Sequence, residues 1–218
     1  MQSGNQDGTA VFKGARKGKG RRYISAGETS GQWMEDEQKR GLVQMKILLI
    51  SSNITMSPYP LYPLGLSMIA SALAGAGHEV RQFDFLQQNN SLDALVQEIM
   101  EFGPGLIGIS VRNIDNVNFM NEQYYIDIVK DIVKRAKEVS VAKVILGGAG
   151  FSLVPELILK ETGADYGIIG EGERLVIDFA AAAAAGIYPE GKLIGPEIRL
   201  TGAEIVSARY DEEMMKYY

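Results

Sequence analysis

Two clusters of very small residues are the places where this chain could bind a ligand. Gly147-Gly148-Ala149-Gly150 and Gly170-Glu171-Gly172-Glu173 each follow a short apolar run. Glycine has no side chain, so the main chain can approach a ligand closely there. Two such turns in succession indicate contact with something large and flat or extended. Glu171 and Glu173 would repel an anion, which argues against phosphate as the bound group.

Other candidate residues follow other apolar runs. Prolines and tyrosines at 59–63 would form a stiff apolar wall, whereas Ser110 and Asn113 offer neutral hydrogen bonds. Connections this long on a rigid scaffold favour a functional role. Together with the glycine turns, the candidates are Ser52, Asn53, Ser110, Val111, Arg112, Asn113, Gly147, Gly148, Ala149, Gly150, Gly170 and Glu171.

Plainer interpretations of these residues stay open. Gly147-Gly148 could be only a tight turn, Ser110 an N-cap, and Glu171 a cap for the following helix. The sequence contains no P-loop, and no GxGxxG follows the first apolar run, so a dinucleotide site is poorly supported. Asp84 stands where dinucleotide enzymes place a ribose-binding acid, but without that glycine loop it is interpreted as a loop residue.

Five apolar runs alternating with five helical patterns would position these residues. A parallel sheet with helices on both faces follows from that alternation. Right-handed crossovers reduce the choice to a doubly wound, five-stranded flavodoxin-like or Rossmann-like α/β domain. In such a sheet ligands bind beyond the carboxyl ends of the strands. The expected strands are 46–51, 78–85, 105–110, 142–148 and 164–170, and the expected helices are 64–77, 91–103, 122–139, 154–163 and 173–185.

The ends of the chain differ from this pattern. Residues 1–44 lack an apolar period and carry a basic run at 13–22, so they are expected to be a disordered or non-native leader. The α/β domain is expected to span 45–186. Residues 187–218 are interpreted as a small hairpin around Gly195 and Pro196, followed by a linker toward a missing catalytic domain.

Composition excludes several classes of function. The 218 residues carry a formal net charge of −5, so no global basic field attracts nucleic acid. The chain has no cysteine, which excludes disulfides, thiolate zinc sites and cysteine-held iron–sulfur clusters within it and suits a cytoplasmic protein. No apolar run reaches the roughly 18 residues needed to span a bilayer, so no membrane partner is expected.

Three segments carry a family resemblance. They are PLGLSMIASALAGAGHEVRQFDF, GLIGISVRN and VILGGAGFSLVPELILKETGADYGIIGEGE. In this order and spacing they resemble the cobalamin-binding domain that precedes the catalytic barrel of radical SAM enzymes, over about residues 46–175.

The resemblance implies cobalamin at the carboxyl edge of the sheet, with its nucleotide tail in the sheet crevice. Ser110, Gly147 and Gly148 would line the tail, and a bulky residue at Gly148 is expected to block it without disturbing the fold. Gly170 and Glu171 would complete the rim. The corrin ring would lie beside the loop at Tyr59–Gly65, which includes Tyr62, Leu64 and Gly65, together with Arg112 and Asn113.

Two departures refine what the resemblance implies. Cobalamin modules of the methionine-synthase type carry Asp-x-His-x-x-Gly after the first strand, and the corresponding SSNITMSPYPLYPLG has no histidine. The single histidine, His78, is expected at the opposite edge, so cobalt receives no imidazole from this chain. The absence of cysteine also removes the Cx3CxxC loop of a radical SAM barrel. S-adenosylmethionine and the 4Fe–4S cluster therefore belong to a missing C-terminal domain, and this fragment alone is not expected to be catalytic.

The resulting prediction is the cobalamin module of a radical SAM enzyme, with methyl transfer as the favoured reaction. Two alternatives stay open. AGAGHEV also suggests the nucleotide-sugar-binding half of a glycosyltransferase, and the same fold could be a docking domain that has lost its ligand.

Overall fold

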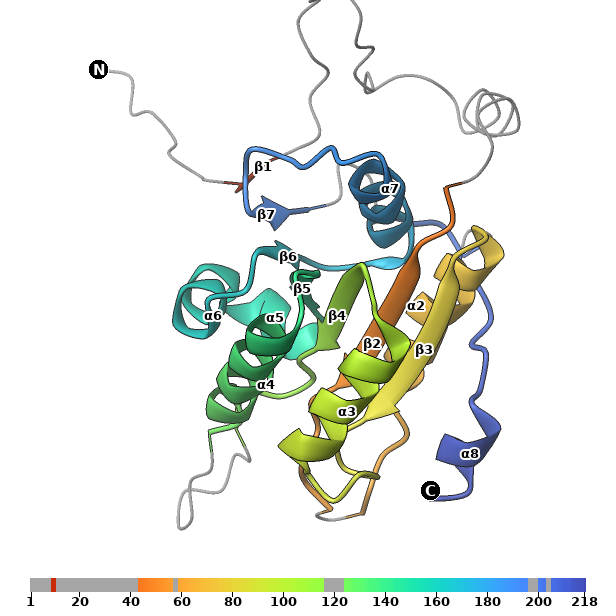
Figure 1. Cartoon of the computed structure of the whole chain (residues 1–218), viewed down its shortest axis with the longest axis vertical. Coiled ribbons are helices and arrows are strands. Elements are labelled where there is room, and N and C mark those ends of the chain that lie inside the picture. The colour runs from red at the N-terminus through yellow and green to blue at the C-terminus, as the bar shows by residue number, and fades with distance from the viewer. Residues whose placement is uncertain (1–8, 11–42, 57–58, 116–123, 196–199, 203–204) are drawn as a thin grey trace, which may run out of the picture.

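The computed structural model describes residues 9–10, 43–56, 59–115, 124–195, 200–202 and 205–218. Its centre is a seven-stranded sheet in the order β1-β7-β6-β5-β4-β2-β3, and every pair is parallel (Figure 1). The strands are β1 Thr9–Ala10, β2 Lys46–Ser51, β3 Glu79–Asp84, β4 Leu106–Ser110, β5 Lys143–Gly147, β6 Tyr166–Ile168 and β7 Leu193–Ile194. The helices are α2 Leu64–Gly75, α3 Leu92–Phe102, α4 Ile126–Val139, α5 Ala149–Leu153, α6 Pro155–Thr162, α7 Glu173–Ala184 and α8 Glu212–Met215.

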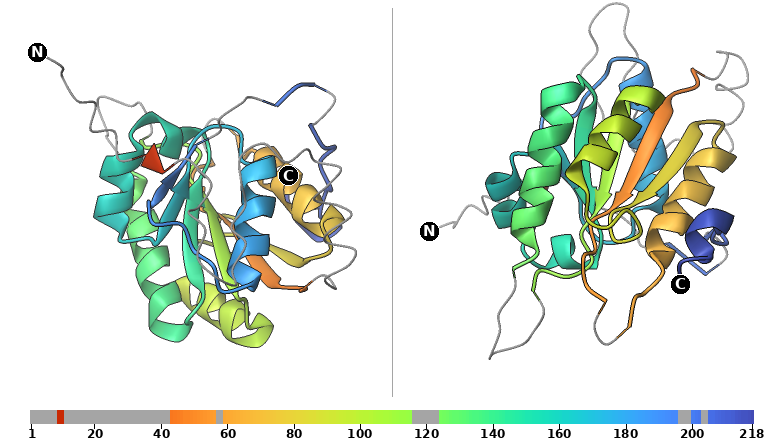
Figure 2. Two further views of the ribbon diagram at one scale, coloured as in Figure 1. Left: turned by 90° about the horizontal axis from the view of Figure 1, so that it is seen from above. Right: turned by 60° about the horizontal axis from the view of Figure 1, so that its bottom comes forward.

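Helices cover both faces of the sheet (Figure 2). Alternate residues of a strand point to opposite faces. Leu48 and Ile50 of β2 accordingly join the core under α3, α4 and α6, while Ile47 and Leu49 join the core under α2 and α7. All four side chains are at most 2% exposed. Burial on both faces explains why the strands are continuous apolar runs, and the doubly wound α/β prediction is confirmed.

The helix ends follow their sequence signals. Ser91 caps α3 by accepting a hydrogen bond from the Ala94 N–H at 3.1 Å. Gly103 ends that helix with φ 63°, and Gly163 ends α6 with φ 69°. Pro155 begins α6 at a position that needs no N–H donor.

The sheet extends beyond the five predicted strands. Leu193 and Ile194, expected in a hairpin, form β7 and pair in parallel with β6. The residues expected to form the other side of that hairpin fall mainly at 196–199, outside the described residues. Within the predicted leader, Thr9 and Ala10 pair with β7. Periodicity could not identify these strands because each is only two residues long.

The C-terminal segment lies beside the edge strand β3 and ends in α8 (Figure 1). The sequence predicts a linker here, yet Met214 is only 2% exposed. The Arg209 N–H donates to Ser67 O at 3.3 Å, and Gln87 Nε2 donates to Glu213 O at 3.1 Å. Residues 205–218, here called the strap, are therefore attached to the α/β body.

Candidate functional site

A row of small and polar residues crosses the carboxyl edge of the sheet. Strand register places Gly147 of β5 beside Ser110 of β4, Ser110 beside Ser51 of β2, and Ser51 beside Asp84 of β3. The row spans the point where β3 and β4 lie on opposite sides of β2, which is where doubly wound sheets bind ligands. Ser52 closes this junction, since its N–H and Oγ both donate to Ser110 O, at 3.3 and 2.9 Å.

The residues of this row point toward one face of the sheet. Leu49, Leu106 and Ile145 belong to the core under α2 and α7. Because strand side chains alternate, Ser51, Ser110 and Gly147, which lie two or four residues further on, share that face. Ser51 is buried, whereas Ser110 and Gly147 are half-buried. The sheet therefore presents small residues below the first turns of α2 and α7, of which Ser110 and Gly147 are partly exposed.

Gly147 and Gly148 differ in whether the surrounding backbone leaves room for a side chain. A Cβ on Gly147 would meet only Ile168 O, at an ordinary 3.9 Å. A Cβ on Gly148 would lie 2.6 Å from Val111 O, and Gly148 has φ 100°. The backbone of this protein, rather than a ligand, therefore requires glycine at 148. The expectation that a bulky residue at 148 spares the fold is wrong.

The loop after β4 and the segment after β5, which includes the start of α5, form one backbone unit. The Val111 N–H donates to Gly147 O at 2.8 Å, and the Gly150 N–H donates to Val111 O at 2.9 Å. A Cβ on Gly150 would lie 2.9 Å from Arg112 O. Val111 is 0% exposed and Gly150 is also buried, so both predicted site residues are structural in this arrangement. Arg112, Asn113 and Ala149 are exposed at the same edge.

Ser152 joins the two glycine turns, and sequence reasoning missed it. Its Oγ donates to Gly148 O at 3.0 Å and accepts from the Gly170 N–H at 2.9 Å. Gly170 has φ 79°. The predicted rim residue Glu171 accepts from the Leu200 N–H at 2.8 Å. Its carboxylate thus holds residue 200 near the turn, a role that neither predicted alternative for Glu171 included.

The loop after β2 and the start of α2 contain both exposed residues and residues whose side chains form hydrogen bonds within the protein. Asn53 closes a local turn: Oδ1 accepts from the Thr55 N–H and Nδ2 donates to Thr55 O, both at 3.3 Å. Leu64 and Gly65, at the start of α2, are exposed, and a Cβ on Gly65 would meet nothing within 4 Å. Tyr62 is different, because its hydroxyl lies 2.7 Å from Ser67 Oγ and accepts from the Asp211 N–H at 3.1 Å.

Asp84 is the last residue of β3 and is 1% exposed, so its interpretation as a loop residue is wrong. Tyr218 Oη donates to Asp84 Oδ2 at 2.5 Å. Burial raises the pKa of Asp84 above its ordinary 3.8, and hydrogen bonds from Tyr218 and Ser51 oppose this increase. Burial, and then Asp84 itself, raise the pKa of Tyr218, so the phenol keeps the proton that it donates.

A pH dependence of stability follows. The raised pKa of Asp84 means that the folded chain holds this proton more tightly than the unfolded chain does. The stabilisation is fully present below the unfolded pKa of about 4 and is lost as the pH rises through the folded pKa. We expect the free energy of unfolding of wild type to fall relative to that of Asp84→Asn as the pH rises above about 4.

Urea unfolding at a series of pH values measures this difference. If the free energies of unfolding of wild type and Asp84→Asn differed by the same amount at every pH, the raised pKa of Asp84 would be contradicted.

His78 immediately precedes β3 and therefore lies at the amino edge, as predicted. Among the described residues, no group of three or more His, Asp or Glu side chains could hold a metal ion. In the same part of the chain, no helix has the length and apolar character needed to cross a bilayer. The cytoplasmic location stays a prediction.

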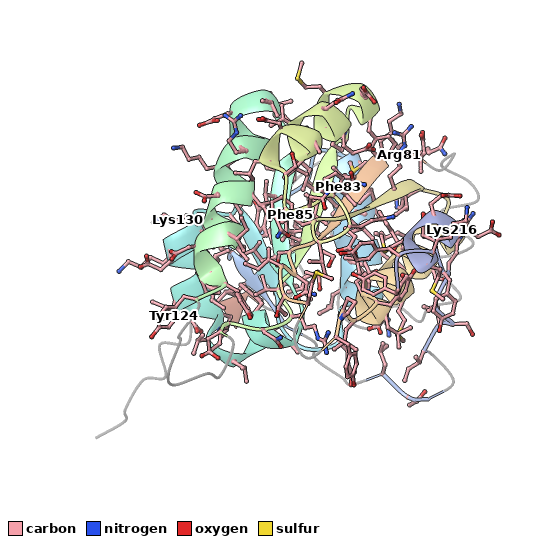
Figure 3. All side chains as sticks on the ribbon, turned by 90° about the horizontal axis from the view of Figure 1, so that it is seen from below. Arg81, Phe83, Phe85, Tyr124, Lys130 and Lys216 are labelled. Atoms are coloured by element: carbon pink, nitrogen blue, oxygen red, sulfur yellow. The ribbon has the colours of Figure 1, made fainter. Side chains whose placement is uncertain are left out.

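Figure 3 shows the molecule from below, the direction in which the arrowhead of β3 points in Figure 1. Tyr124, two residues before α4, lies on one flank. Lys216, which follows α8, lies on the other flank, as does Arg81 of β3. Apolar side chains are exposed in the connections that leave this edge after β2, β4 and β5. They are Met56 at 59%, Tyr59 at 62%, Leu64 at 47%, Tyr124 at 63%, Leu153 at 69% and Val154 at 38%.

Comparison with known proteins gives matches over the same region. A family model described as B12 binding domain matches residues 51–180. Tryptophan 2-C-methyltransferase of Streptomyces laurentii is 30% identical over 131 residues, which cover 58% of this chain and 21% of that protein. Cytidylyl-2-hydroxyethylphosphonate methyltransferase of Streptomyces wedmorensis is 30% identical over 173 residues, which cover 67% of this chain and 31% of that protein.

A solved structure has the same fold over about two thirds of this chain. It is the radical S-adenosylmethionine methyltransferase TsrM from Kitasatospora setae, with tryptophan substrate and the analogue aza-SAM bound. It gives a TM-score of 0.62 and 28% identity, covering 66% of this chain and 27% of that one. TsrM with cobalamin and a 4Fe–4S cluster bound gives a TM-score of 0.64 at 23% identity, covering 76% of this chain and 31% of that one. This chain thus spans about a third or less of the length of each relative.

Proposed function

Because this chain belongs to the B12-binding domain family, we propose that it binds cobalamin at the carboxyl edge of its sheet. One observation carries the proposal: Ser51, Ser110 and Gly147 form a row of small residues on one face, below α2 and α7. The row lies at the switch point of the strand order and within the part of the chain that the family model matches. Small residues leave room on this face for a narrow group such as a nucleotide tail.

The residues that would hold the cofactor divide into a floor and a rim. Ser110 supplies a hydroxyl and Gly147 supplies bare backbone for the tail, and Gly170 would complete the rim. Leu64, Gly65, Arg112, Asn113 and Ala149 are exposed and would contact the ring at the rim. The exposed apolar side chains around the same edge support a large, partly apolar ligand or partner there.

Cobalt would lack an imidazole ligand from this chain. The only histidine, His78, precedes β3 and is separated from the carboxyl edge by the full length of that strand. Six residues at about 3.3 Å per residue are too long a span for a side chain to cross.

We further propose that the parent enzyme is a radical SAM methyltransferase. The names of the relatives support this, because both curated proteins and TsrM are methyltransferases. When bound, cobalamin supplies a cobalt centre that can carry a methyl group. This chain would position that cofactor, while S-adenosylmethionine and the 4Fe–4S cluster would be held by a further domain, C-terminal to this one. The relatives are named for different methyl acceptors, so they do not indicate the acceptor here.

Reconstitution tests the cofactor. The purified chain is mixed with hydroxocobalamin, desalted, and examined by visible absorption. We expect a retained corrin spectrum at about one cobalamin per chain. A colourless protein would contradict cobalamin binding and favour the ligand-free docking domain. A colourless protein that binds a uridine or guanosine diphosphate sugar would instead favour the glycosyltransferase alternative, which none of the matches described here supports.

A further inference from the structure

We infer that the strap, residues 205–218, fixes the Tyr59–Pro63 loop beside the proposed cofactor site, so that Tyr62, Asp84 and Tyr218 are positioning residues of that site. The inference rests on the proposed function for the identity of the ligand. The contacts themselves come from three parts of the chain that are far apart in sequence.

Tyr62 connects the loop to the strap. Its ring lies 5.4 Å from that of Tyr210 and 5.7 Å from that of Tyr218, centroid to centroid. Its hydroxyl accepts from the Asp211 N–H and contacts Ser67 Oγ, which donates to Gln82 Oε1 at 2.9 Å. One side chain thus joins the loop, α2, β3 and the strap. Leu64 and Gly65, which we place at the rim of the site, follow Tyr62 by two and three residues.

Tyr218 connects the end of the strap to the row of residues at the carboxyl edge. Its hydroxyl donates to Asp84, which is in register with Ser51, and Ser51 is in register with Ser110. The strap therefore holds both the loop and the carboxyl end of β3. Asp211 stabilises the strap locally by accepting from the Met214 N–H at 2.8 Å, and Met214 is buried.

The strap is held at separate points rather than along its length. A hollow of about 530 Å³ separates it from β3, lined by Val80, Arg81 and Gln82 on one side and Arg209–Glu212 on the other. Few attachment points mean that the loss of one hydroxyl should be measurable. The contribution of a single buried hydrogen bond corresponds to about a fivefold change in an equilibrium constant.

Tyr62→Phe and Tyr218→Phe test the inference, because each removes one hydroxyl and keeps the ring. The first measurement is backbone hydrogen exchange of residues 61–67 and 205–218 in the cofactor-free chain. The second is the rate at which bound hydroxocobalamin dissociates. We expect exchange in both segments and cofactor dissociation each to be about fivefold faster. Tyr210→Phe is the matched control, in the same strap with a side chain that is 55% exposed, and should leave both rates unchanged.

The outcomes separate this inference from the proposed function. Unchanged exchange in both variants would overturn the strap as a restraint on the loop. Faster exchange with unchanged cofactor dissociation would overturn the positioning role. A wild-type chain that retains no cobalamin would instead overturn the proposed function, and the positioning role with it. The exchange data would still decide whether the strap holds the loop.

Discussion

Gly147→Leu is expected to abolish retention of cobalamin while the chain still folds. Ile145 points toward the face of the sheet covered by α2 and α7, and a side chain at 147, two residues further along β5, would point the same way. We place the nucleotide tail on this face. A Cβ there would meet only Ile168 O at 3.9 Å, so the backbone tolerates a side chain at this position. The rest of the leucine would occupy the space of the tail. We expect binding weaker by about 100-fold, equivalent to about 2.8 kcal/mol.

The measurement is titration with hydroxocobalamin followed by visible absorption, with urea unfolding of the same protein. Gly75→Leu is the size-matched control, since Gly75 is exposed at the far end of α2 with nothing within 4 Å of its Cβ position. Undiminished binding by a folded Gly147→Leu protein would show that the tail does not pass this glycine.

Gly148→Ala is expected to damage the fold itself. Gly148 has φ 100° and ψ 171°, a region that only glycine occupies readily, and forcing another residue into it costs about 1–3 kcal/mol. The added Cβ would also lie 2.6 Å from Val111 O, a backbone atom that accepts a hydrogen bond from the Gly150 N–H. Together these effects should lower the free energy of unfolding by about 3 kcal/mol or more.

Urea unfolding of Gly148→Ala and Gly75→Ala compares a strained glycine with a helical one. Gly75→Ala should be neutral or stabilising by up to about 1 kcal/mol. If Gly148→Ala were within about 0.5 kcal/mol of wild type, the turn would not need glycine at 148, and the separation of roles between 147 and 148 would be lost.

The sequence predicted the parts of the fold that depend on local pattern. The five central strands and their connecting helices were confirmed because an apolar run or a 3.6-residue period is complete within one segment. The resemblance to cobalamin-binding domains of radical SAM enzymes is confirmed by the family match over residues 51–180. Residues at strand ends, such as Ser110 and Gly147, could be placed at one edge because parallel strands share a direction.

What the sequence could not predict depends on contacts between distant residues. Asp84 pairs with Tyr218, 134 positions away, and Tyr62 contacts Asp211, 149 positions away. No local pattern distinguishes a buried aspartate of this kind from a loop residue. The difference between Gly147 and Gly148 likewise depends on where Val111 lies. Ser152 could have been noticed from the sequence. It lies four residues after Gly148, a spacing at which a serine hydroxyl can reach the carbonyl one helical turn earlier.

The position of the strap has a consequence for how the chain behaves at high concentration. β3 ends the sheet and pairs, among the described strands, only with β2, so one side of its six-residue backbone has no strand partner. A bare edge of this kind is a template for adding a strand from another molecule. The strap, which includes α8, stands beside that edge and obstructs it. Shortening the chain before residue 205 would therefore be expected to promote self-association and aggregation as well as loosening a loop.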